Sequence, residues 1–182
     1  MLYIMRHGKT DWNEIRKLQG RTDIPLNEEG RKMAEEVRKE CEEIGFDICY
    51  SSPLTRARET AEIALKGLDV PIQTDDRLME MCFGIYEGAV NAGSVEGSPI
   101  QKFFDSPELF MGTENGETFD ELFKRTGSFI DEMIKPALKE GKKVLIVGHG
   151  AMNAGMICNV KHPGKDRFWD EPMENCKLIK LL

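Results

Sequence analysis

The sequence predicts an α/β fold, a three-layer sandwich in which helices cover both faces of a mostly parallel sheet. Short apolar segments alternate with amphipathic ones along the chain, which is typical of strands joined by right-handed crossover helices. The length of 182 residues fits one domain with a sizeable core. With 40% hydrophobic and 31% charged residues, the composition is that of ordinary folded domains.

Five short apolar segments are the expected strands. The first lies almost at the start of the chain and the last lies at its end. Each has the length of a strand, and each of the first four is followed by polar or glycine-containing residues. The expected strands are residues 2–5, 46–50, 70–74, 143–147 and 178–182.

Caps and apolar spacing indicate the helices between these strands. Asn27 precedes two glutamates and apolar residues at helical spacing, and Gly45 ends that helix. Ser52-Pro53 is expected to cap and start a second helix. A capping box at 118–121 opens a long third helix, and another helix is expected after Gly150.

Residues 84–116 are expected to form a small lid or insertion over the C-terminal edge of the sheet. The segment is rich in glycine and has one short helical pattern near Phe103 and Phe104. Residues 7–26 are expected to be a polar loop. The chain, residues 1–182, is therefore predicted to be a single domain that carries one insertion.

The net charge of −7 argues against nucleic acid or an anionic membrane as a partner. No segment approaches the length of about 20 apolar residues that spans a bilayer. The N-terminus shows no signal-peptide pattern. The five cysteines include no C-x-x-C pair, which indicates buried thiols in a reducing compartment. A cytoplasmic location is therefore expected.

Positively charged and nucleophilic side chains follow three of the predicted strands. Arg6 and His7 follow the first strand, and His149 follows the strand at 143–147. Arg56 comes after the second strand, in the first turn of a helix. Because open α/β sheets bind ligands beyond the carboxyl ends of their strands, we expect these four residues at one site. Two arginines and two histidines near helix N-termini suit a tetrahedral anion such as phosphate or sulfate.

Each of these residues also has an ordinary structural explanation when it is taken alone. A histidine at a strand end is more often a satisfied core or capping group, and Arg58 is expected to be a helix-surface arginine. His162 is interpreted as a solvated surface residue. The histidines and carboxylates lack the spacing of a metal site, so neither a metal nor another cofactor is expected. An anion-binding site is favoured because basic side chains follow three predicted strands at the same edge of the sheet.

A series of short motifs runs in order along nearly the whole chain. They are Arg6-His7-Gly8 with Thr10 and Asn13, Leu26-Asn27-Glu28-Glu29-Gly30, Ser51-Ser52-Pro53-Leu54-Thr55-Arg56-Ala57, Leu78-Met79-Glu80, Phe83-Gly84, Gly116-Glu117-Thr118, Val147-Gly148-His149-Gly150 and Asn175-Cys176. This combination resembles the phosphatase branch of the histidine phosphatase superfamily, the phosphoglycerate-mutase-like group. Lys9 and Tyr86 stand where Glu and Trp are common in that family. Residues 89–115 match none of its motifs.

The resemblance implies a role for each residue of the predicted site. His7 would be the nucleophile that takes the phosphoryl group, and a neutral imidazole suits that task near pH 7. Arg6, Arg56 and His149 would surround the transferring group and stabilise its charge. Asn13 would donate a hydrogen bond to a phosphate oxygen.

Glu80 is expected, from the same resemblance, to act as the general acid and base. It would protonate the leaving alkoxide and then take a proton from water as the phosphohistidine is hydrolysed. Without the family motif it would be interpreted as a surface carboxylate in a charged loop. Glu87 and Glu117 are the alternative acids.

The predicted activity is that of a histidine acid-type phosphatase, a metal-independent hydrolase of small organic phosphomonoesters that works through a phosphohistidine. A cofactor-dependent phosphoglycerate mutase would use the same site, although such mutases usually carry longer insertions and a C-terminal tail. A non-catalytic phospho-ligand-binding protein is a weaker third class, because every expected chemical group is present. The expected partner is a small phosphorylated metabolite, and the expected state is a monomer or a homodimer.

The composition of the lid bears on the substrate. Between residues 81 and 116, Lys102 is the only basic residue, while acidic and aromatic residues are frequent. This predicts a leaving group that is not strongly anionic. Two alternatives stay open: the aromatic residues form only the lid's own core, or the first loop supplies cations from Lys9, Arg16, Lys17 and Arg21.

Overall fold

A five-stranded sheet lies at the centre of the protein, in a computed structural model that describes residues 1–161 and 164–182. The strand order is β3-β2-β4-β1-β5. The first four strands are parallel, and β5 is antiparallel to β1. The strands are β1 (Leu2–Arg6), β2 (Ile48–Ser51), β3 (Ile72–Thr74), β4 (Val144–Gly148) and β5 (Leu178–Lys180). The predicted α/β fold with a mostly parallel sheet is confirmed.

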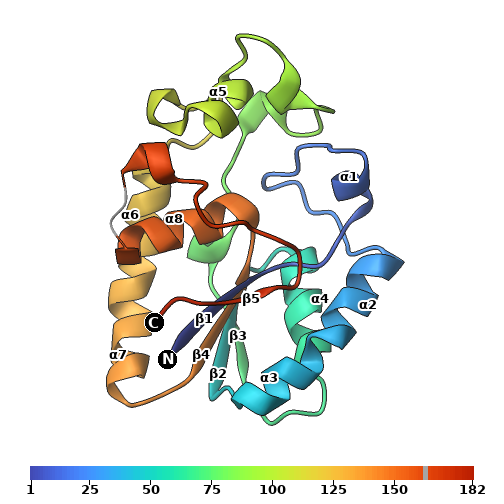
Figure 1. Ribbon diagram of the computed structural model, residues 1–182, viewed down its shortest axis with the longest axis vertical. Helices are drawn as coiled ribbons and strands as arrows, with labels where there is room; N and C mark the ends of the chain where they lie inside the picture. The colour runs from blue at the N-terminus through green and yellow to red at the C-terminus, as the bar shows by residue number, and fades with distance from the viewer. Residues whose placement is uncertain (162–163) are drawn as a thin grey trace.

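One face of the sheet packs against helices from the first third of the chain (Figure 1). Successive strand residues point to opposite faces, and Met5 and Val147 belong to the set on this side. Small side chains on the helices let them approach the sheet closely. The helices on this face are α2 (Glu28–Glu36), α3 (Arg38–Ile44) and α4 (Thr55–Ala64).

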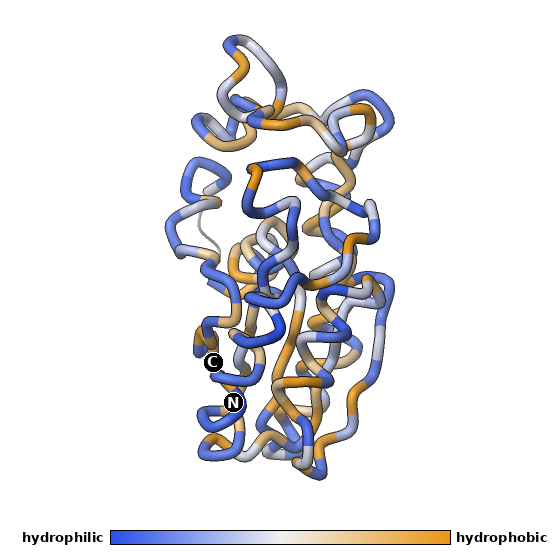
Figure 2. The backbone as a smooth tube through the Cα atoms, turned by 90° about the vertical axis from the view of Figure 1, so that its right-hand side faces the viewer, coloured by the Kyte–Doolittle hydropathy of each residue, from blue (hydrophilic) through white to orange (hydrophobic). Residues whose placement is uncertain are grey.

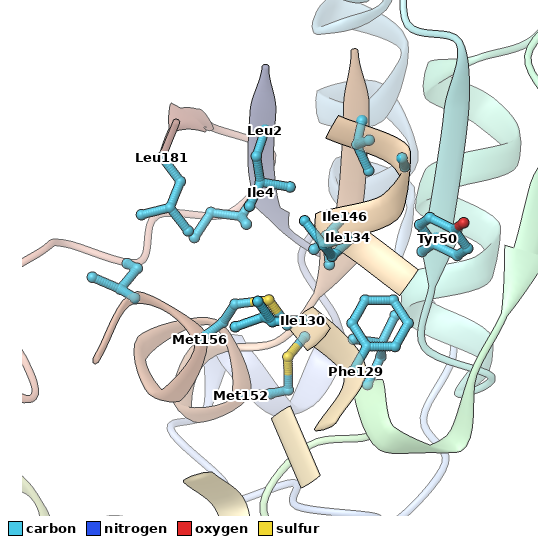
Figure 3. Packing of buried hydrophobic residues seen from close by; sticks show 14 of the residues in the cluster. Leu2, Ile4, Tyr50, Phe129, Ile130, Ile134, Ile146, Met152, Met156 and Leu181 are labelled. Carbon is cyan, nitrogen blue, oxygen red and sulfur yellow. The ribbon is translucent and has the colours of Figure 1, made fainter. Parts of the chain in front are cut away.

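The other face of the sheet carries the larger apolar cluster, which Figure 3 shows from close by. Ile4 and Ile146 from the strands pack there against Phe129 and Met152 from the helices. The helical elements on this face are α6 (Phe119–Phe129), the π-helical turn η5 (Ile130–Ile134), α7 (Lys135–Lys139) and α8 (Gly150–Lys161). In the described part of the chain, no helix is long and apolar enough to cross a membrane.

The segment 84–116 lies at the end of the molecule opposite the two termini, beyond the carboxyl ends of the parallel strands (Figures 1 and 2). Its centre is Phe103, which is 1% exposed and contacts several aromatic rings. The predicted short helix near Phe103 and Phe104 is present. The helical turns of this lid are η2 (Gly84–Tyr86), η3 (Ala92–Ser94), α5 (Pro99–Asp105) and η4 (Pro107–Leu109).

Local boundaries differ from the expected ones in the strands, where β2 and β3 each begin two residues later and β5 ends two residues earlier, and at three places in the loop and the helices. The polar loop 7–26 contains a one-turn helix, α1 (Asp11–Glu14), because Thr10 and Asn13 form a capping box. The helix expected between Asn27 and Gly45 breaks at Val37, where α2 ends and α3 begins. Ser52-Pro53 does not start α4, whose N-cap is the extended residue Leu54.

Candidate active site

Neighbouring strands end at one edge of the sheet and bring the predicted site residues together. Arg6 ends β1 and pairs in register with Gly148 at the end of β4. The backbone N–H of His7 donates to the carbonyl of Gly148 at 2.9 Å. The ring centroids of His7 and His149 lie 5.2 Å apart, and Arg56 Nε lies 3.3 Å from His7 Nε2. The four basic side chains predicted to converge therefore do so, beside a pocket of about 350 Å³.

The imidazole of His7 is buried and held in one orientation. Its Nδ1–H donates to the carbonyl oxygen of Gly8 at 2.6 Å, which assigns the proton to Nδ1. Nε2 is therefore unprotonated, and its lone pair accepts from Arg56 Nε–H at 3.3 Å. Burial, and next the positive charges of Arg56 and Arg6, hold the pKa of His7 well below its ordinary value of 6.5. A neutral imidazole with an available Nε2 is the form that can act as a nucleophile.

Arg56 is fully buried in the first turn of α4. Its guanidinium donates to the carbonyl oxygens of Gly20 and Thr22 at 2.7 and 2.9 Å, and its Nε donates to His7 Nε2. Burial lowers its pKa to about 10, so the side chain keeps its charge at neutral pH. Arg56 thus places a fixed positive charge against the nitrogen that would attack phosphorus.

Arg6 and His149 leave buried hydrogen-bonding capacity next to His7. Arg6 donates one N–H to the carbonyl oxygen of Met173 at 2.9 Å, while its Nε has no partner among the described residues. Both ring nitrogens of His149 are buried and lack a partner among those residues as well. Burial, and next the charge of Arg56, hold the pKa of His149 well below its ordinary value. Arg6 lines the pocket, whereas His149 is fully buried and is not among the lining residues.

Asn13 also lines the pocket, and its amide is oriented by a local cap. The Oδ1 atom accepts hydrogen bonds from the backbone N–H and the hydroxyl of Thr10, both at 3.1 Å. An amide whose oxygen is engaged in this way has its NH₂ group left to donate. The predicted donor role of Asn13 is compatible with this geometry.

Glu80 is buried at the pocket wall, so its interpretation as a surface carboxylate is wrong. Its Oε1 accepts from the backbone N–H groups of Met81 and Met152, at 2.8 and 2.9 Å. Its Oε2 accepts from the N–H of Ala151 at 3.2 Å. These donors from the first turn of α8 fix the carboxylate beside the arginine and histidine cluster.

Two further contacts hold the loop that carries His7. The hydroxyl of Thr60 accepts from the N–H of Gly8 at 2.9 Å and donates to the carbonyl of Arg56 at 2.6 Å. Asn175 donates its side-chain N–H to the carbonyl of His7 at 2.6 Å. The loop is therefore fastened to α4 on one side and to the chain before β5 on the other.

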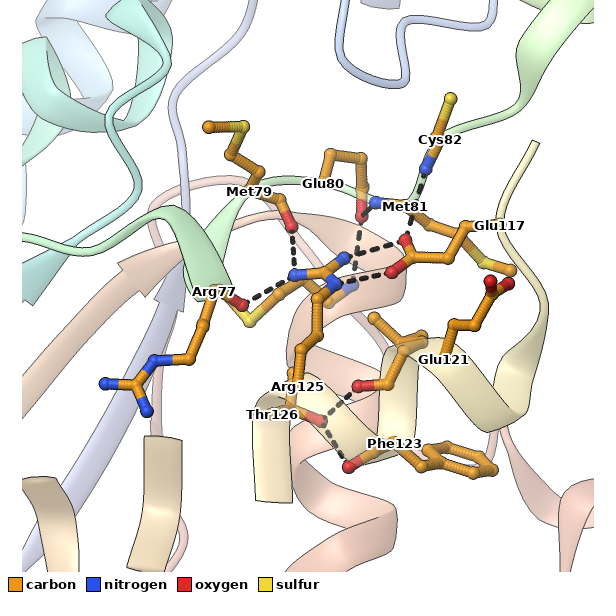
Figure 4. Close-up of polar contacts among 12 residues, drawn as sticks. Arg77, Met79, Glu80, Met81, Cys82, Glu117, Glu121, Phe123, Arg125 and Thr126 are labelled. Atoms are coloured by element: carbon orange, nitrogen blue, oxygen red, sulfur yellow. Dashed lines mark hydrogen bonds and ion pairs between the residues drawn. The ribbon is translucent and has the colours of Figure 1, made fainter. Parts of the chain in front are cut away.

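The alternative acids Glu87 and Glu117 hold backbone segments and do not line the pocket. Glu87 accepts from the backbone N–H groups of Arg21 and Thr22, which belong to the loop that binds Arg56. Glu117 forms a two-pronged ion pair with Arg125 at 2.6 and 2.9 Å (Figure 4). Glu80 is therefore the carboxylate that reaches the pocket among these three.

The rest of the pocket wall consists of residues that the sequence did not predict as members of the site. One part is aromatic and apolar, and the stacked rings of Phe104 and Trp169 belong to it. Another part carries Arg16 and Lys17, which form no ion pair with any described residue. Phe103 lines the pocket but is mainly a core residue of the lid, as the core alternative predicted. The sequence signals for this wall were the charge of the first loop and the aromatic residues of the lid.

No group of histidine, cysteine or carboxylate side chains suitable for a metal ion occurs within 1–161 and 164–182. His162, interpreted as a surface residue, lies outside the described residues. The four cysteines other than Cys82 are buried, as expected for thiols used as small apolar side chains.

A family model described as "Histidine phosphatase superfamily (branch 1)" matches residues 2–182. The chain belongs to the histidine phosphatase superfamily. It is 36% identical over 158 residues to "Uncharacterized phosphatase PhoE" of Bacillus subtilis, which covers 86% of this chain and 75% of that protein. It is 32% identical over 154 residues to "Probable phosphoglycerate mutase GpmB" of Escherichia fergusonii, covering 82% and 69%. Among solved structures, Bacillus stearothermophilus YhfR superposes with a TM-score of 0.87 and 32% identity, over 97% of this chain and 88% of that one.

The relatives include one named as a phosphatase and one named as a probable phosphoglycerate mutase. These are the two activities that the sequence analysis left as alternatives. Membership of this superfamily supports a phosphatase-type enzyme. The motifs that suggested the family from the sequence also supply the residues at the strand ends.

Proposed function

We propose that this protein hydrolyses small organic phosphomonoesters through a phosphohistidine on His7. The observation that carries the proposal is the state of that side chain. Its Nδ1–H donates to the Gly8 carbonyl, so Nε2 carries no proton and accepts a hydrogen bond from Arg56 Nε at 3.3 Å. A phosphate oxygen that takes over this Arg56 N–H would leave the Nε2 lone pair free to attack phosphorus. Arg6, Arg56 and Asn13 supply donors for the phosphate oxygens from three different segments.

The reaction has two steps. In the first, His7 Nε2 forms a bond to phosphorus as the P–O bond to the alcohol breaks, and Glu80 gives its proton to the leaving oxygen. In the second, Glu80 takes a proton from water, the water oxygen bonds to phosphorus, and the P–N bond breaks. Inorganic phosphate leaves, and both His7 and Glu80 return to their starting forms.

A screen of phosphorylated metabolites, with phosphate release as the readout, tests the activity. The wild-type protein is expected to release phosphate from at least one alkyl monophosphate, and His7→Ala is expected to lose that activity. Arg58→Ala serves as the matched control, because Arg58 is exposed on α4 and, among the described residues, forms an ion pair only with Glu62, at 3.7 Å. Near wild-type turnover by His7→Ala would contradict the proposal.

Metal independence follows from the residues that supply the positive charge. Arg6 and Arg56 already face the phosphate position, and the described residues offer no metal-ligand cluster. Dialysis against a chelator is expected to leave phosphate release unchanged. Activity that is lost on chelation and restored by Zn²⁺ or Mg²⁺ alone would overturn this part of the proposal.

A phosphoglycerate mutase is the second candidate, and the positions of Arg16 and Lys17 favour it. Both line the pocket, where they could attract a carboxylate on the leaving group. The aromatic wall with Phe104 and Trp169 favours a neutral or apolar leaving group instead. We expect kcat/KM for hydrolysis of a neutral alkyl monoester to exceed that for interconversion of 2- and 3-phosphoglycerate. The reverse order would replace the phosphatase with the mutase.

A further inference from the structure

An ion pair between the partly buried Arg125 and the buried Glu117 holds the chain segment that carries Glu80 (Figure 4). Arg125 of α6 donates to the carbonyl oxygens of Arg77 and Met79, at 2.6 and 2.8 Å. Its partner Glu117 accepts from the N–H of Cys82 at 3.3 Å. The backbone N–H of Glu117 donates to the carbonyl of Cys82 at 2.8 Å. The pair therefore holds backbone groups on both sides of Glu80.

The geometry of the Arg125–Glu117 pair suits a role in holding the backbone around Glu80 better than the role of an ordinary surface ion pair. The side chains of Arg125 and Glu117 are 14% and 8% exposed, and the contact is two-pronged. A planar guanidinium can bind both carboxylate oxygens while its remaining N–H groups reach carbonyls, which an ammonium group cannot do in the same way. The fork of Arg125 thus holds two carbonyls of the 77–82 backbone, beside a contact from Arg21 Nε to the carbonyl of Glu80 at 3.3 Å.

The start of the segment has a separate attachment. The side chain of Arg77 binds Asp75 at 2.8 Å and Glu132 at 2.7 Å. Arg77 also donates to the hydroxyl of Ser128 in α6 at 2.9 Å. Because none of these contacts involves Arg125, loss of the Arg125 contacts leaves the segment attached to α6 and η5. Loss of the Arg125 contacts should therefore displace mainly Glu80. It should also weaken the hydrogen bonds that the α8 amides donate to the Glu80 carboxylate.

We propose that Arg125, with Glu117, is a positioning pair that sets the place of the Glu80 carboxylate relative to His7. This inference rests on the proposed function, since it concerns the acid of that reaction. Arg125 is not placed at the reacting atoms and does not line the pocket. Its effect reaches the chemistry through the backbone of residues 77–82 and the side chain of Glu80.

The dependence on the leaving group separates this role from a general structural one. Arg125→Lys keeps the charge but loses the fork, and Glu117→Asp keeps the charge but shortens the partner. Each is expected to lower kcat/KM on an alkyl monophosphate by about 10- to 100-fold, because small displacements of a proton donor are costly. On p-nitrophenyl phosphate, whose leaving group needs no proton, the loss should stay below about threefold. Arg31→Lys is the matched control, since Arg31 joins α2 to α4 through Glu59 at 2.6 Å.

A double-mutant cycle with Glu80→Gln completes the kinetic test. In that background Arg125→Lys is expected to add no more than about a twofold loss on the alkyl substrate, since the group it positions is gone. Additive losses, or equal losses on both substrates, would overturn the proposal and assign Arg125 a general structural role.

Residue-resolved hydrogen exchange tests the same claim without any turnover. The amides of Met81, Ala151 and Met152 donate to Glu80, so they should exchange faster in Arg125→Lys and in Glu117→Asp than in wild type or Arg31→Lys. Unchanged exchange at these amides would contradict the proposal. If the wild-type protein hydrolyses neither substrate, the proposed function fails, and the exchange measurement alone decides whether the pair positions Glu80.

Discussion

The imidazole of His7 owes its chemical form to contacts that a histidine in water would lack. The Gly8 carbonyl fixes the proton on Nδ1, and burial with two neighbouring arginines favours the neutral ring. The same arginines that lower its pKa would stabilise the phosphoryl group that it receives. One set of charges therefore prepares the nucleophile and binds the group that is transferred.

Removal of the Glu80 carboxyl should affect substrates according to how much their leaving group needs a proton. Glu80→Gln is expected to lose about 10²- to 10⁴-fold in kcat/KM on an alkyl phosphate. The loss on p-nitrophenyl phosphate should be much smaller. Steady-state kinetics on both substrates measures the difference. Equal losses would indicate a structural role for Glu80, and the same pattern in Glu87→Gln would move the acid to that residue.

The elements around the site depend on one close approach between the His7 loop and α2. Gly8 and Gly30 meet there, and a Cβ atom built on Gly30 would lie 2.1 Å from the carbonyl oxygen of Lys9. Any side chain at Gly30 must therefore move the backbone that follows His7. Gly30, in the first turn of α2, is therefore needed to let the loop that carries His7 approach the helix.

Gly30→Ala is expected to destabilise the protein by about 1–3 kcal/mol through this overlap. It should also lower kcat/KM, because the displaced backbone carries His7. Gly127→Ala is the matched control: Gly127 lies within α6, where a Cβ would meet Asn159 at an ordinary 3.5 Å. That variant should gain up to about 1 kcal/mol from helix propensity. Urea unfolding of both variants checks the prediction, and a Gly30→Ala protein as stable as Gly127→Ala would contradict it.

At the scale of the whole molecule, the buried histidines couple folding to pH. His7 and His149 have pKa values well below 6.5 in the folded protein, so the unfolded chain binds more protons at acidic pH. The free energy of unfolding should therefore fall as the pH drops below about 6.5, by up to about 1.4 kcal/mol per pH unit for each histidine. The contribution is fully present above that pH.

His149→Gln should lose less stability than wild type between pH 7 and pH 5. Denaturant unfolding at several pH values, without phosphate in the buffer, measures the two slopes. Identical slopes for the two proteins would mean that His149 is not held neutral in the folded state.

The sequence was sufficient for the features that depend on local pattern. The strand ends that carry Arg6, Arg56 and His149 follow from apolar segments and the rules of parallel sheets. The pocket wall was harder to predict, because Arg16 and Trp169 meet there only after the lid has packed. The same is true of contacts across long separations, such as the 72 positions between Glu80 and Met152. The residues next to Glu80 and Met152 in the sequence do not indicate that these two residues form a hydrogen bond.

Trapping of the phosphorylated enzyme tests the central claim most directly. The wild-type protein is mixed with a labelled alkyl monophosphate, quenched within milliseconds in alkali, and digested for mass spectrometry. The account predicts an acid-labile, alkali-stable phosphoryl group on His7 that forms within the first turnover and disappears in a chase with unlabelled substrate. Turnover without any such adduct, or an adduct on a residue other than His7, would contradict it.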